Sequence, residues 1–198
     1  GHGNGPEGTA DVTIQNTPPT CEKAVILPTT GGTETDFVCQ CTQWSDPDAG
    51  DEPMDQCTFK TDEGVILGGE TGAVGPCTLE AMHTEKGMTI ICTLFPNDGE
   101  DSGDGVESDP ATVLNTAPTP PSGVVLTPEE ADVTTILTCS YEQTATDADG
   151  DTVSYTSHWV VNGYENPGGN SNITQAGQLM SAVGVPAVKG DTVFCRVR

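Results

Sequence analysis

The sequence predicts an all-β protein made of two tandem β-sandwiches. Three observations predict this: short apolar runs alternate with polar residues, landmarks repeat after about one hundred positions, and the eight cysteines are even in number. Gly (24) and Pro (15) are abundant, which favours short strands joined by turns over long helices. No segment has an apolar period of 3.6 residues over a helical length.

The internal repeat depends on five landmarks that follow one another in the same order in both halves. Each half has an Asn-Thr-x-Pro-Thr segment, an apolar run ending near proline, an apolar-flanked cysteine, an Asp-rich loop, and a Lys-Gly pair shortly before another cysteine. The first half carries them at residues 16–20, 24–28, 37–39, 45–51 and 86–92, and the second at 115–119, 124–128, 137–139, 146–151 and 189–195. A period of this length suits independent sandwich domains. The sequence therefore predicts an N-terminal extension (1–16), a first domain (17–115) and a second domain (116–198).

Several predicted strands alternate between apolar and polar residues. Residues 152–161 form such a run, and Asn162-Gly163 after it is typical of a tight hairpin turn. Residues 192–197 and 11–14 alternate in the same way. We expect all three segments to be β-strands.

Cys139, Trp159 and Cys195 occur in this order in the second domain. This resembles the immunoglobulin fold, a Greek-key sandwich with one cysteine on strand B, a tryptophan on strand C and one cysteine on strand F. The resemblance implies a Cys139–Cys195 bridge and a counterpart, Cys39–Cys92, in the first domain. There Phe59 or a near neighbour stands where the tryptophan is expected.

The first domain has four further cysteines, Cys21, Cys41, Cys57 and Cys77. If Cys39 pairs with Cys92, three pairings of these four remain, and we favour Cys41–Cys57 with Cys21–Cys77. An even cysteine count in a β-rich chain predicts an oxidising compartment, so we expect an extracellular or cell-surface protein.

The second domain lacks the strand that closes the first. Residues 111–115 form that closing strand, whereas only residues 196–198 follow Cys195. Residues 10–16 match the closing strand and precede the first domain. Two explanations fit: the chain is an excerpt of a longer array, or the N-terminal strand of one copy completes the last sandwich of another. The second explanation predicts a head-to-tail polymer interface formed by Val12, Ile14, Phe194 and Val197. An N-terminal tail without order is the alternative to both.

The Asp-rich loops are candidate cation sites. In the second domain Asp147, Asp149 and Asp151 alternate around Gly150, and calcium prefers such hard oxygen ligands. This loop resembles those of cadherin-like and other bacterial surface sandwich repeats. The first domain has Asp46, Asp48 and Asp51, which Asp98, Asp101 and Asp104 could approach from the F–G loop, as Asn115 could approach Asp147. The alternative is that these carboxylates form solvent-exposed Asx-turns.

The net charge of −24 argues against nucleic acid and anionic membranes as partners. No stretch of about 18 apolar residues is present, so membrane insertion is not expected. The three histidines are scattered over the N-terminus, a turn region and a strand, so no arrangement of nucleophile, base and orienting acid is indicated, and we expect no enzyme activity. Asn172 begins the glycosylation triplet Asn-Ile-Thr.

These observations predict a structural subunit or repeat module of an extracellular filament or surface stalk, stiffened by disulfides, whose partners are other copies of itself. Two alternatives remain: an adhesion module that binds a protein or glycan through its loops, with Trp44, Tyr141 and Tyr164 as candidate aromatic contacts, and an accessory domain of a secreted enzyme. Sandwich domains of this kind have many functions, so the fold does not choose among them.

Overall fold

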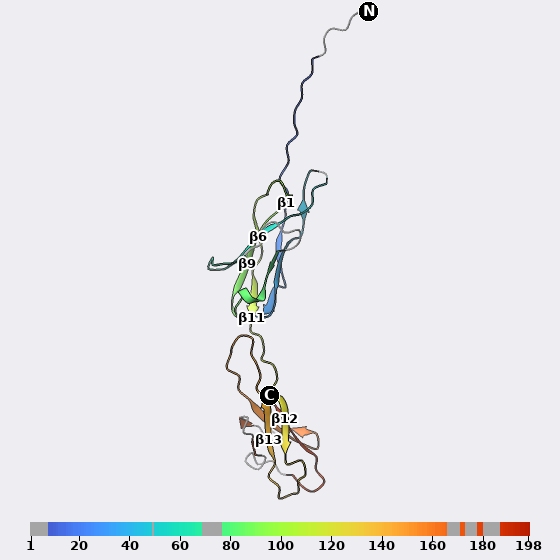
Figure 1. The fold of residues 1–198 in the computed structure, drawn as a ribbon, viewed down its shortest axis with the longest axis vertical. Helices are drawn as coiled ribbons and strands as arrows, with labels where there is room; N and C mark the ends of the chain where they lie inside the picture. The colour runs from blue at the N-terminus through green and yellow to red at the C-terminus, as the bar shows by residue number, and fades with distance from the viewer. Residues whose placement is uncertain (1–7, 49, 69–76, 166–170, 173–177, 180–186) are drawn as a thin grey trace, which may run out of the picture. The chain divides into compact units, whose positions relative to one another are not determined.

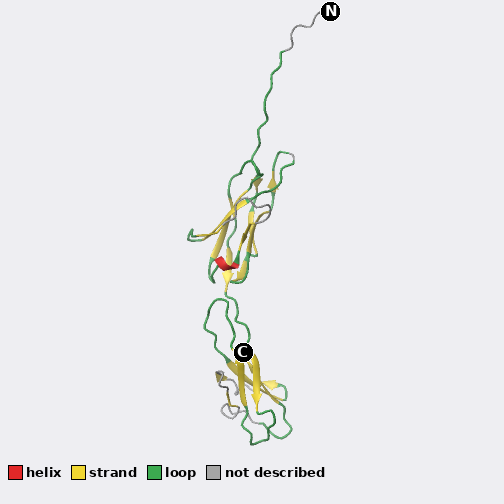
Figure 2. Cartoon of the chain, viewed as in Figure 1, coloured by secondary structure: helices red, strands yellow, loops and turns green. Residues whose placement is uncertain are grey.

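The computed structural model describes residues 8–48, 50–68, 77–165, 171–172, 178–179 and 187–198. The contacts divide the chain into two compact units, Gly1–Leu114 and Asn115–Arg198. In the described parts the regular structure is β-strand, apart from one 3₁₀ turn, η1 (Ala81–His83) (Figures 1 and 2). The protein is therefore all-β.

The first unit is a sandwich of two sheets. One sheet has the order β2 (Ala24–Leu27), β4 (Phe37–Cys41), β8 (Cys77–Leu79). The other has the order β3 (Thr30–Gly32), β11 (Ala111–Leu114), β9 (Thr89–Phe95), β6 (Gln56–Thr61), β7 (Ile66–Gly68), with β10 (Val106–Glu107) also on β9. β1 (Thr20–Cys21) pairs with β5 (Trp44–Ser45). These sheets correspond to strands A-B-E and A′-G-F-C-C′ of an immunoglobulin-like sandwich.

The core of the first unit forms where inward-facing residues of the two sheets meet. β9 buries every second residue, including Ile90, Cys92 and Leu94. Cys39 of β4 bonds to Cys92 of β9 and so joins the two sheets. Phe59 lies opposite Cys92 in the β6–β9 register and is fully buried, so it fills the place of the expected tryptophan.

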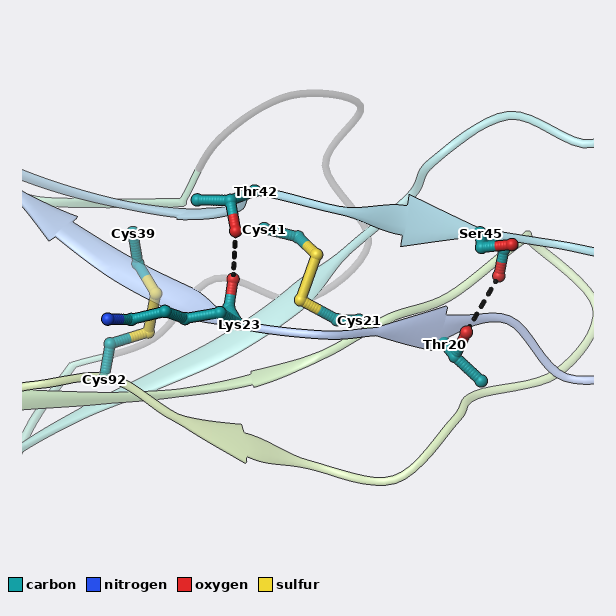
Figure 3. The surroundings of a disulfide bond; sticks show 8 residues. All are labelled: Thr20, Cys21, Lys23, Cys39, Cys41, Thr42, Ser45 and Cys92. Atoms are coloured by element: carbon teal, nitrogen blue, oxygen red, sulfur yellow. Dashed lines mark hydrogen bonds between the residues drawn. A yellow bond between two sulfur atoms is a disulfide. The ribbon is translucent and has the colours of Figure 1, made fainter.

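The other two bridges of this unit differ from the favoured pairing. Cys21 bonds to Cys41 (Figure 3). Cys57 bonds to Cys77. The favoured pairs Cys41–Cys57 and Cys21–Cys77 are therefore wrong. β1 pairs antiparallel with β5, and β2, the next strand, pairs antiparallel with β4, so Cys21 and Cys41 lie on neighbouring segments with 5.9 Å between their Cα atoms. Cys77 lies opposite Cys39 in the register, so it faces the core and reaches Cys57 on the other sheet.

The described residues of the second unit repeat this plan with fewer strands. One sheet has the order β12 (Ser122–Thr127), β13 (Thr138–Gln143), β17 (Gln178–Leu179). In the other, β14 (Thr156–Val161) pairs with β15 (Tyr164–Glu165), β16 (Ser171–Asn172) and β18 (Val193–Val197). Cys139 bonds to Cys195, and Trp159 lies opposite Cys195 in the register and is fully buried.

Two predicted strands are shorter or absent. Within residues 152–161, the strand begins only at Thr156. The hydroxyl of the preceding residue, Tyr155, accepts a hydrogen bond from the Ala145 N–H at 2.8 Å. Asn162 and Gly163 have φ values of 50° and 82°, which close the hairpin as expected. Residues 11–14 form no strand, because a strand needs a neighbour and none lies beside them in the described chain.

Candidate functional site

The Asp-rich loop of the first unit holds the segment that enters it. The main-chain N–H of Thr17 donates to Asp48 Oδ2 at 2.7 Å, and the Asp48 N–H donates to Asp46 Oδ1 at 2.7 Å. Asp46, Asp48 and Asp51 each place a carboxylate oxygen within 4.8 Å of the others. The loop is thus both an Asx-turn and a cluster of three acids.

The second unit reproduces this arrangement. The Thr116 N–H donates to Asp149 Oδ2 at 2.7 Å, and the N–H groups of Asp149 and Asp151 donate to Asp147 Oδ1 at 2.9 and 3.1 Å. The oxygens of these three aspartates also lie within 4.8 Å of one another. A contact between the entering segment and the Asp-rich loop is therefore a repeated feature of the chain.

Asn16 is a site residue that sequence reasoning did not single out. Its Nδ2 donates to Asp98 Oδ2 at 2.9 Å and to Asp101 Oδ2 at 3.1 Å. The Asn-Thr pair repeated at 115–116 was the available signal. Asn115 differs, since its Nδ2 donates to the Thr116 carbonyl at 3.0 Å. In the described part of the chain no hydrogen bond joins Asp104 to the acidic cluster.

The electrostatics of the first cluster favour a cation. Burial, then the negative charges of Asp46, Asp98 and Asp48, raise the pKa of Asp51. The Asn16 hydrogen bond and the main-chain donors around residues 98–101 lower the pKa of Asp98. Asp46 Oδ2 is buried and has no hydrogen-bond partner among the described residues. The oxygens of Asp46, Asp48 and Asp51 could thus ligate a hard cation such as calcium, which takes six to eight oxygen ligands.

The second candidate site, after the Asp-rich loops, is the outer edge of β18. In the first unit its counterpart β9 pairs with β6 on one side and β11 on the other. In the second unit β18 pairs with β14, and no strand in the described residues lies on its other side. Cys195 and Val193 are only partly buried, whereas their counterparts Cys92 and Ile90 are fully buried. Among the described residues, the second core is therefore less covered along this edge than the first.

The four predicted interface residues have different environments. Val12 and Ile14 are each 83% exposed. Phe194 is 41% exposed on the outer face of β18. Val197 instead points inward, is 7% exposed and packs in the core with Trp159. Val197 therefore supports the core from within and is not a surface contact.

The remaining candidates are spread over the chain. Tyr141 is buried against the Tyr155 ring, Trp44 is partly buried, and Tyr164 is 81% exposed. These three aromatics thus form no exposed patch. The His158 ring lies 2.6 Å from Glu165 Oε1. Asn172 lies on β16, while Ile173 and Thr174 of its triplet fall outside the described residues.

Comparison with protein-family models and with curated proteins finds no match for this chain. Among solved structures, a two-domain fibronectin type-III segment from chicken tenascin is similar, with 14% identity and a TM-score of 0.39; the match covers 88% of this chain and 87% of that one. The FN1–FN3 domains of chicken CNTN1 match with 11% identity and a TM-score of 0.31, over 89% of this chain and 54% of that one. The chain thus spans about half the length of the CNTN1 segment. Sequence identities and TM-scores this low carry no information on function.

Disulfide-linked sandwiches of this kind are typical of extracellular proteins and act as structural or binding modules. In the described part of the chain no helix has the length and apolar character needed to span a membrane.

Proposed function

We propose that the protein is a structural module of an extracellular filament or surface stalk, in which copies associate head-to-tail by strand complementation. The observation that carries this proposal is the outer edge of β18, beside which no described residue forms a strand, together with the exposed Val12 and Ile14. An open sheet edge beside a partly open core is an association site unless a strand covers it. Donor and acceptor lie in different parts of the chain, so the contact is heterologous and can continue as a filament.

The alternation of the N-terminal segment supports this use. The repeat aligns Val12 with Ala111 and Ile14 with Val113, since Asn16-Thr17 aligns with Asn115-Thr116. Ala111 is fully buried and Val113 is 1% exposed in β11. A donated strand would bury Val12 and Ile14 in the same way, and each such burial contributes roughly 1.5–3 kcal/mol.

The test compares three forms of the full chain by sedimentation velocity and electron microscopy. We expect the wild-type chain to form head-to-tail oligomers and the Val12→Asp/Ile14→Asp variant to be monomeric. Thr13→Asp is the matched control: it adds charge on the opposite face of the same segment and should still assemble. Because each copy carries a charge of −24, assembly should strengthen as salt screens the repulsion.

Monomers in all three samples, at low and high salt, would exclude strand exchange between copies. The role would then be that of a module in a longer array or of an adhesion module. A glycan or protein array probed with the same chain separates these two roles, because only an adhesion module binds selectively.

We also propose that the Asp-rich loops bind calcium and stiffen the segments entering each unit. Support comes from the two clusters of three carboxylates and from the unpaired, buried Asp46 Oδ2. Calorimetric titration of the full chain with calcium chloride should show heat of binding that Asp51→Asn reduces at the first loop and Asp151→Asn at the second. Asp62→Asn, an exposed acid in another turn, is the control. Calcium should also lower the pKa of Asp51; an unchanged pKa would contradict binding there.

A further inference from the structure

The second unit has a cavity of about 410 Å³ at one end of the open edge of β18. It is lined by residues 131–133 and 187–191 together with Leu137 and Val193. Val133 and Val188 are each 67% exposed at this cavity, although both are apolar. Exposed apolar residues around a hollow indicate a surface that a partner covers.

The first unit shows what lies at the equivalent place. Its residues align with the second unit without gaps from Pro28/Pro128 to Cys39/Cys139, and from Lys86/Lys189 to Cys92/Cys195. Gly31, Gly87 and Met88 therefore correspond to Ala131, Gly190 and Asp191, and all three of the latter line the cavity.

In the first unit these three positions surround Val113 of β11. Val113 pairs with Gly31 in the parallel β3–β11 register. Its carbonyl accepts the Gly87 N–H at 2.8 Å, and its N–H donates to the Met88 carbonyl at 2.9 Å. The cavity of the second unit thus lies where a closing strand would place one buried apolar side chain.

The strand next to β11 is also missing its counterpart. β3 (Thr30–Gly32) pairs with β11 and with no other strand in the described residues. The corresponding residues 130–132 of the second unit form no strand. This is the expected result if that segment becomes a strand only when a partner lies between it and β18.

We infer that this cavity receives the Ile14 side chain of a second copy, with residues 12–15 lying antiparallel to β18 and parallel to residues 130–132. The inference rests on the proposed strand complementation and adds its register and its anchor. Ile14 is the counterpart of Val113, and its side chain is one methylene larger. In this register Val12 lies opposite Val193, and Thr13 lies opposite Thr192, as Ala111 and Thr112 lie opposite Ile90 and Thr89.

Disulfide trapping tests this register on the full chain. Thr13→Cys and Thr192→Cys are made in separate chains, mixed and oxidised, so that only intermolecular pairing links them. Both positions are exposed, and non-reducing mass mapping verifies that the four native bridges are retained. We expect a cross-linked dimer in at least fivefold excess over that from Thr13→Cys with Phe194→Cys, which tests a register shifted by two residues on the same face. Adding Ile14→Asp to the Thr13→Cys chain should abolish the cross-link.

Three results overturn the inference in distinguishable ways. If the copies associate but cross-link through Phe194→Cys, the register is wrong while strand complementation stands. If Thr13→Cys and Thr192→Cys cross-link regardless of Ile14→Asp, the cavity is not the anchor. If neither pair cross-links and sedimentation shows monomers, strand complementation itself fails, and with it the assignment of Ile14 to this cavity.

Discussion

The main-chain N–H of Thr17 donates a hydrogen bond to Asp48 Oδ2 at 2.7 Å, across 31 residues of sequence. The same bond recurs 99 residues later between Thr116 and Asp149. A carboxylate of each Asp-rich loop therefore fixes the segment that enters its unit. Each loop thus forms a local turn and also a hydrogen bond to the segment that enters its unit.

Loss of this tether should loosen the entering segment. Asp48→Ala removes the acceptor of the Thr17 N–H, and we expect the first unit to lose about 1 kcal/mol of stability against urea. Asp48→Asn keeps an acceptor oxygen and is the matched control. Amide exchange at Thr17, followed by NMR, should accelerate in the alanine variant and much less in the asparagine variant. Equal exchange in all three forms would contradict the tether.

Asn16 should make the stability of the first unit depend on pH through Asp98. The Asn16 hydrogen bond, the largest cause, holds the pKa of Asp98 below its usual range. A carboxyl whose pKa is lowered by folding stabilises the fold above its unfolded pKa, and this contribution is lost as the pH falls through the folded pKa. Asn16→Ala should therefore raise the pKa of Asp98 and destabilise the unit at neutral pH.

The destabilisation by Asn16→Ala should shrink in acid well below the usual aspartate range, where Asp98 is protonated in both folded and unfolded chains. Carbon-detected NMR titration measures the pKa, and urea unfolding at the two pH values measures the stability. Gln15→Ala, at an exposed neighbouring position, is the control and should change neither. A loss of stability of the same size at both pH values would assign Asn16 a role in packing alone.

Replacing Trp159 with phenylalanine should destabilise the second unit less than replacing it with alanine. Its side chain is fully buried, and its indole Nε1 has no hydrogen-bond partner within the described residues. Trp159→Ala leaves a large cavity and should cost about 3–5 kcal/mol. Trp159→Phe keeps a ring against the disulfide, as Phe59 does in the first unit, and removes the unpaired N–H, so we expect a cost below about 2 kcal/mol. Urea unfolding followed by circular dichroism measures both, and equal costs would contradict the prediction.

The Cys39–Cys92 and Cys21–Cys41 disulfides should contribute different amounts to the stability of the first unit. The Cys39–Cys92 bridge spans 53 residues and Cys21–Cys41 spans 20, so loop entropy predicts losses of about 4 and about 3 kcal/mol when both partners become alanine. The buried Cys39–Cys92 pair adds a packing loss that the less buried Cys21–Cys41 pair does not. Denaturant unfolding of the two double variants should rank them in this order. The reverse order would show that unfolded-state entropy does not dominate.

The sequence by itself predicted the all-β class, the two repeated units and two of the four bridges, Cys39–Cys92 and Cys139–Cys195. The class and the units follow from local alternation and from the internal repeat. The two bridges follow from the resemblance of Cys139, Trp159 and Cys195 to the immunoglobulin pattern, which the repeat extends to Cys39 and Cys92. The same resemblance implied the inward position of Trp159 beside its disulfide, where the structure buries it fully.

Only the tertiary structure decided the features that depend on which strands are neighbours. The pairing of Cys21 with Cys41 and of Cys57 with Cys77 depends on strand order, which cysteine spacing does not reveal. The contact of Asn16 with Asp98 spans 82 residues, and the repeated Asn-Thr pair marks the position of Asn16 without revealing its partner. Residues 11–14 alternate like a strand yet form none, because alternation specifies a face while a strand also requires a hydrogen-bonded neighbour.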